Sequence, residues 1–91
     1  MINKYKLPLI KGLFTAKEAK EVLLLMVGDK IAFHKKEVFS LKERNNGDTS
    51  RHEKRILELK EVQTSIKDII KDSEEKVLQL KISSDITIEL L

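Results

Sequence analysis

The sequence predicts a mainly α-helical α+β fold: a long antiparallel two-helix hairpin with a short N-terminal and a longer C-terminal β-strand, completed by dimerisation. Two long segments, 15–44 and 51–77, carry apolar residues at helical spacing, and a turn-forming sequence separates them. The tail, 78–90, alternates apolar and polar residues as a half-buried strand does. We therefore expect residues 1–91 to form a single domain.

The first eleven residues, 1–11, are expected to form a strand or an arm. Tyr5, Leu7 and Leu9 alternate with Lys4, Lys6 and Pro8, which is the period-two pattern of a half-buried strand. Pro8 has no backbone N–H to donate, so this strand is expected at a sheet edge. Gly12 is expected to end it.

A capping signal marks the start of the first helix, 15–44. Thr15 and Glu18 have the spacing of a capping box, in which each side chain bonds an amide that the first turn leaves without a partner. The predicted core stripe consists of Ala16, Ala19, Leu23 or Leu24, Val27, Ile31, His34, Val38 and Leu41. Gly28 is read either as a tolerated glycine or as a point of close helix approach.

The run 22–27 is apolar on every side of the first helix. A bilayer needs about 20 apolar residues, so this run cannot cross a membrane. It must instead be buried on more than one side, which a single partner helix does not achieve. The predicted interface with a second copy or another protein comprises Val22, Leu25, Met26 and Phe33.

Two aromatic residues, Phe33 and Phe39, flank the core stripe. As exposed aromatics they would anchor a partner. As core residues at the edge of the helix–helix seam they need no function, and we favour this second reading.

The sequence Asn45-Asn46-Gly47-Asp48 is the clearest turn in the chain, because Asn and Gly tolerate positive φ. Thr49 or Ser50 is expected to cap the second helix, 51–77. Its predicted stripe consists of His52, Ile56, Leu59, Val62, Ile66, Ile69 or Ile70, Ser73 and Val77.

Folding the chain at Asn46-Gly47 sets a register between the two stripes. His34 then meets Leu59, and His52 meets Leu41. The two histidines would lie about 10 Å apart along the hairpin at 1.5 Å per residue, which argues against a shared metal site. We read His34 as a core histidine bonded to a neighbour, and its alternative is a titrating switch or a ligand.

The tail, 78–90, is expected to form a strand with one buried face, bent at Ser83-Ser84. The apolar set is Leu78, Leu80, Ile82, Ile86, Ile88 and Leu90. The hairpin brings both terminal segments to one end, where they would pair antiparallel, either within one chain or between two. Because a two-stranded sheet is marginal alone, we predict a homodimer.

Catalysis lacks the residues that it needs. The chain has no cysteine, which excludes disulfides and thiolate chemistry. No serine sits in a nucleophile elbow, and no glycine-rich phosphate loop occurs. We expect no enzyme activity, no cofactor and no metal site. The N-terminus lacks a signal-peptide apolar core, so we expect a cytoplasmic protein without a membrane partner.

The predicted function is therefore a structural or protein-interaction module that acts as a helical-hairpin homodimer. The alternative is a nucleic-acid-binding accessory protein that contacts phosphates through a basic hairpin tip. The residues for that contact are Lys42, Arg44, Arg51, Lys54 and Arg55. The alternative is that these cations have no binding function and are solvated at the hairpin tip, where they form ion pairs within the helix.

Four segments, FTAKEAKE (14–21), DKIAFH (29–34), FSLKER (39–44) and ITIEL (86–90), together resemble a group of small bacterial helical proteins of unknown function. The resemblance covers most of the chain. It implies a small bacterial domain and adds no functional residue.

Overall fold

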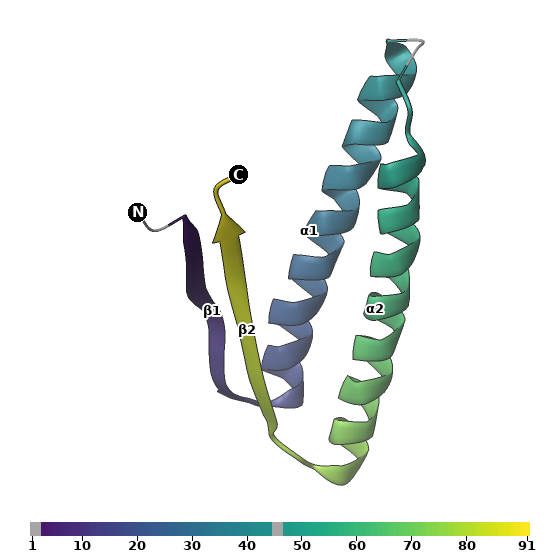
Figure 1. Cartoon of the computed structure of the whole chain (residues 1–91). Helices are drawn as coiled ribbons and strands as arrows, with labels where there is room; N and C mark the ends of the chain where they lie inside the picture. Colours follow the sequence, from purple (N-terminus) through teal and green to yellow (C-terminus); the bar gives the residue numbers. More distant parts are fainter. Residues whose placement is uncertain (1–2, 45–46) are drawn as a thin grey trace.

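The computed structural model describes residues 3–44 and 47–91. The elements follow the order β1 (Lys4–Phe14), α1 (Ala16–Glu43), α2 (Ser50–Lys76) and β2 (Leu80–Glu89) (Figure 1). The two helices form the predicted antiparallel hairpin. The two strands pair antiparallel within one chain, which resolves the alternative that the sequence left open.

The two strands have nearly equal lengths, 11 residues in β1 and 10 in β2. The expectation that Gly12 ends the first strand is therefore wrong. A β-bulge lies between Pro8 and Ile10, where the register is irregular. The extra residue shifts the alternation, so that Ile10 is buried and Leu9 is exposed. Ile10, beside this bulge, pairs with Ser84, at the position where we expected the second strand to bend; β2 itself is one continuous strand, Leu80–Glu89.

The start of α1 confirms the capping box. The backbone N–H of Glu18 donates to Thr15 Oγ1 over 3.1 Å, and the backbone N–H of Thr15 donates to Glu18 Oε1 over 2.9 Å. The bond from the backbone N–H of Thr15 favours the charged carboxylate, so it lowers the pKa of Glu18.

At the start of α2 the capping group differs from the predicted one. Thr49 is the N-cap residue, but its side chain makes no cap hydrogen bond. Instead, the carboxylate of Asp48 accepts from Ser50, over 2.9 Å from the backbone N–H and 2.7 Å from the hydroxyl. Both bonds lower the pKa of Asp48. The side chain that caps α2 is therefore Asp48, two residues before Ser50, and not Thr49 or Ser50 as predicted.

The connection between the helices also changes their register. A Cβ placed on Gly47 would lie 2.7 Å from the Cβ of Leu41, so the returning chain packs against the last turns of α1. In Figure 1, α2 accordingly begins well below the end of α1. His34 and His52 meet as a result, with their Nδ1 atoms 2.8 Å apart. The predicted separation of about 10 Å was wrong because it assumed a tight reversal at residues 46–47, of which Asn46 is outside the described residues.

The hairpin seam supplies most of the core. The buried residues of the helices are Ala19, Ile31, His52, Leu59, Ile70 and Ser73. The structure chooses Ile70 over Ile69, since their side chains are 3% and 59% exposed. Val62 and Val77, which we placed on the stripe, are exposed. A Cβ on Gly28 would meet no atom within 4 Å, so this glycine permits no close approach within the described chain.

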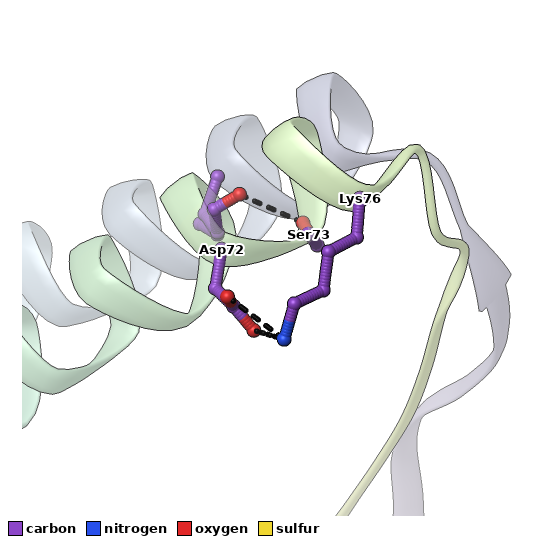
Figure 2. A network of polar contacts seen from close by, with 4 residues as sticks. Asp72, Ser73 and Lys76 are labelled. Carbon is purple, nitrogen blue, oxygen red and sulfur yellow. Dashed lines mark hydrogen bonds and ion pairs between the residues drawn. The ribbon is translucent and has the colours of Figure 1, made fainter.

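The last turns of α2 hold one buried hydroxyl on the stripe. Figure 2 shows Ser73 beside an ion pair on the exposed side of the helix. Ser73 Oγ donates to the carbonyl of Ile70 over 2.7 Å, which satisfies this polar group in the seam. Lys76 Nζ lies 3.1 Å from the carboxylate of Asp72, one turn earlier. That pair is exposed and contributes little to stability.

The helix ends in a Schellman-type motif with an unusual residue. The N–H of Leu78 donates to the carbonyl of Ser73 over 3.0 Å, and the N–H of Val77 donates to Glu74 over 3.3 Å. Val77 has φ 54° and ψ 47°, the left-handed conformation that this motif usually gives to glycine. A β-branched residue is strained there.

We expect Val77→Gly to stabilise the protein by about 1 kcal/mol, because glycine adopts the left-handed conformation without the steric cost of a Cβ. The side chain of Val77 is 90% exposed, so its removal costs almost no packing. The midpoint of urea denaturation measures the change. Val77→Ala keeps a Cβ and is the control. An equal gain from Val77→Ala would show that the backbone conformation is not the cause.

The sheet and the helical hairpin meet at one end of the molecule and then diverge. Figure 1 shows the two strands rising from the base of the hairpin and leaving α1 progressively toward the termini. The Cα radius of gyration is 16.6 Å, whereas a compact chain of this length has about 12 Å. The described helices contain no stretch that could span a membrane.

Candidate interaction surfaces

One face of the sheet is apolar along its length except at Ser84. On β2 it carries Leu80, Ile82, Ser84, Ile86 and Ile88, which share a face by the period of two. Near the base of the hairpin, Leu80 and Ile82 are half-buried. Toward the termini, Tyr5, Leu7, Ile86 and Ile88 are between 40% and 50% exposed. We call these last four residues the open sheet face.

The predicted interface on α1 divides into two kinds of position. Val22 and Met26 are half-buried, whereas Leu25 and Phe33 are 65% and 51% exposed. Phe39 is also exposed, so our reading of the two phenylalanines as core residues at the seam edge is wrong in the single chain. The seam passes through His34, as the predicted stripe does, and Phe33 is the next residue around the helix, on the outer side of that seam.

At the other end of the hairpin, a histidine pair links the helices. His34 comes from α1 and His52 from the first turn of α2, and their ring centroids lie 5.1 Å apart. Phe33 contacts the ring of His34 edge-on, also at 5.1 Å, and Lys30 Nζ lies 5.6 Å from the centre of the Phe33 ring. His34 is therefore bonded to a neighbour, as we predicted for a core histidine, and that neighbour is a second histidine.

A shallow hollow beside this pair gathers positive charge. Its lining residues are Lys30, His34, Arg51, Lys54, Arg55 and Glu58. Three of the five residues predicted for nucleic acid thus lie together. Lys42 instead lies 3.8 Å from Glu53, and Arg44 caps the end of α1. We did not single out Lys30, although its position one turn before His34 places both on one side of the helix.

The pKa of His34 is lowered, first by burial and then by the nearby positive groups of His52, Lys30, Arg55 and Arg51. The Nδ1–Nδ1 contact has the same consequence. One ring must donate its Nδ1 proton and the other must accept it, so the contact requires at least one neutral imidazole. Glu58 does not offset the cations fully, since it pairs with Arg55 at 3.5 Å.

We therefore expect stability to fall as the pH decreases through the ordinary histidine pKa, about 6.5. Below that value the unfolded chain binds a proton that folded His34 resists, which favours unfolding. Thermal unfolding at pH 7.5 and pH 5.5 measures the loss. Both values lie above the range in which Glu18 and Asp48 titrate, because their pKa values are lowered. His34→Gln is the control and should show a smaller difference between the two pH values.

Among the described residues, no group of three or more metal-ligating side chains comes together. The histidine pair supplies two imidazole ligands at most, and Lys30, Arg51, Lys54 and Arg55 lie beside it. The arrangement of charge at the hairpin tip therefore suits an anion better than a metal ion.

No family model, curated protein or solved structure matches the chain. The resemblance to small bacterial proteins consequently stays a prediction, and the function must be argued from the geometry.

Proposed function

We propose that this protein is a non-enzymatic interaction module that works as a homodimer, in which a second copy covers apolar surface that one chain leaves open. The observation that carries the proposal is the open sheet face: its large side chains continue the more deeply covered part of the same face but are 40% to 50% exposed. Exposed apolar patches of this kind mark interaction sites.

The sparse core supports the same proposal. Among the described residues, no large side chain is fully buried, and five hydrophobic residues make up the buried set. A core of that size contributes little free energy to a chain of 91 residues. The two-stranded sheet is also marginal alone, since isolated hairpins rarely persist in water. Dimerisation adds the buried apolar area that both parts lack.

The absolute mass tests this proposal. The chain contains one tyrosine and no tryptophan, so refractive index rather than absorbance should give the concentration. We expect light scattering after a sizing column to give twice the 10.5 kDa of one chain, at both low and high salt. Hydrophobic contacts do not weaken with added salt, whereas contacts between charges do. A monomer at both salt concentrations would end the proposal.

A second candidate function is binding of nucleic acid at the hairpin tip. The observation that favours it is the hollow in which Arg51, Lys54 and Arg55 meet Lys30, with the exposed ring of Phe33 nearby. Cations that bind phosphates, combined with an aromatic ring that stacks on bases, are typical of proteins that bind single strands.

An electrophoretic shift with a labelled single strand tests this candidate. A shift at low salt that disappears in Arg51→Glu and Arg55→Glu would support it, because phosphate contacts depend strongly on salt. Lys17→Glu, at the opposite end of α1, is the matched charge control. Micromolar protein that gives no shift at low salt would exclude this function.

A further inference from the structure

The two edges of the sheet differ in their ability to accept another strand. The outer edge of β1 carries three features that natural proteins use to block pairing: Pro8, the adjacent bulge and a series of lysines. The outer edge of β2 has none of them. Its ten residues, LKISSDITIE, contain no proline or glycine and include four β-branched residues, which favour strands.

Backbone geometry shows which groups β2 presents. The N–H of Leu90 donates to the carbonyl of Asn3 over 2.6 Å, so these two residues form a hydrogen-bonded pair. Along an antiparallel ladder such pairs alternate with pairs whose N–H and C=O groups point outward. In the observed register, Asp85, Thr87 and Glu89 belong to the outward set. Pro8, opposite Asp85, fits this alternation, because an outward position needs no N–H.

We propose that β2 pairs with β2 of a second copy, antiparallel and centred on Ser84, to form one four-stranded sheet with β1 on each outer edge. This inference rests on the proposed homodimer and specifies its contact. Pairing through β1 would instead set lysines against lysines, which is unfavourable.

The charges on β2 favour a second copy in this orientation. Lys81 lies near one end of the strand, and Asp85 and Glu89 lie toward the other. An antiparallel neighbour with the same sequence places its acidic end beside Lys81, whereas a parallel neighbour places acid beside acid.

The centre of symmetry follows from the side chains that would face each other. With two Ser84 residues at the centre, Ile82 lies opposite Ile86 of the second copy, and Leu80 lies opposite Ile88. The apolar face then continues across the interface. A centre one residue later sets two Asp85 carboxylates directly opposite each other, so that register is disfavoured. Ser84 is the one polar residue of this face on β2, and its small side chain fits the centre of a symmetric crossing.

A cysteine at the centre tests the register. The two Ser84 residues would form a non-hydrogen-bonded pair, whose Cα atoms lie about 4.5 Å apart, within the range of a disulfide. The chain has no cysteine of its own. We expect Ser84→Cys to convert most of the protein into a covalent dimer under mild oxidation. Ser83→Cys is the matched control: it lies on the opposite face and out of register with its counterpart, so it should remain uncrosslinked.

A proline pair tests the edge. Thr87 and Lys6 lie directly opposite each other in the sheet, and the N–H of each points away from the other strand. We expect Thr87→Pro to raise the dimer dissociation constant at least tenfold, while Lys6→Pro leaves it unchanged. Circular dichroism checks that both variants keep the fold.

These outcomes separate this inference from the proposal on which it rests. A wild-type monomer would overturn both. A wild-type dimer in which Ser84→Cys does not crosslink and Thr87→Pro has no effect would overturn the β2 contact but leave the homodimer. Crosslinking by Asp85→Cys in place of Ser84→Cys would overturn the proposed register.

Discussion

Replacing Ile70 by alanine is expected to destabilise the folded protein by about 2–5 kcal/mol, the range observed when a large buried aliphatic residue is truncated. The side chain of Ile70 is 3% exposed and lies in the hairpin seam, where it lines a hollow with Leu24. Truncation removes apolar surface from the seam and leaves a void that two stiff helices cannot close. With only five buried hydrophobic residues in the described chain, no other cluster can compensate.

The neighbouring Ile69 offers a matched control. It has the same side chain in the same helix, but 59% of it is exposed. We expect Ile69→Ala to change stability by less than about 1 kcal/mol, since exposed substitutions have small effects. Urea denaturation of all three proteins at one fixed concentration gives the comparison, because the stability of a dimer depends on concentration. Equal losses at the two positions would mean that the seam lies elsewhere.

The contrast between Ile69 and Ile70 also shows the limit of the sequence as evidence. The alternation of apolar and polar residues predicted the two strands, and helical periodicity predicted the two helices and placed the core on one side of each. It could not choose between two adjacent isoleucines, because a difference of 100° around the axis falls within the width of an apolar stripe. That choice depends on the partner helix, whose register the sequence did not determine.

The register was beyond prediction for a local reason. We placed the reversal at Asn46-Gly47, and the observed packing of Gly47 on Leu41 brings the chain back along α1 before α2 begins. This packing is a tertiary contact, and no sequence motif predicts it. The bulge beside Pro8 is similar, since one extra residue exchanges Leu9 for Ile10 on the inner face. In both places the sequence pattern predicted the type of element, but it did not predict how that element aligns with its partner helix or strand.

The candidate surfaces show the same division. The basic residues near the turn were visible in the sequence, and three of them meet in one hollow. The contact between His34 and His52 was not foreseen, because it depends on the register. Leu25 was predicted at an interface because the run 22–27 is apolar all round, and its exposure on the single chain keeps that prediction open to test.

Leu25→Asp is expected to raise the dissociation constant of the proposed homodimer about 30-fold or more, which corresponds to about 2 kcal/mol, the size of a hot-spot contribution. A carboxylate at this position would lose its hydration when a second copy covers it, which disfavours association. Because Leu25 is 65% exposed, the substitution should leave the fold of each chain intact. Sedimentation equilibrium over a range of concentrations measures the constant.

The matched control is Leu57→Asp. Leu57 lies on α2 and is 64% exposed, so the two leucines differ in position but hardly in exposure. Both substitutions place aspartate in the interior of a long helix and carry the same small propensity cost, roughly 0.5 kcal/mol. Any difference between the dissociation constants of the two variants therefore comes from the surface on which the leucine lies and not from a change in helix stability. If both variants dissociate alike, general destabilisation is the cause. If neither does, the homodimer does not use this side of α1, and the contact must lie on the sheet alone.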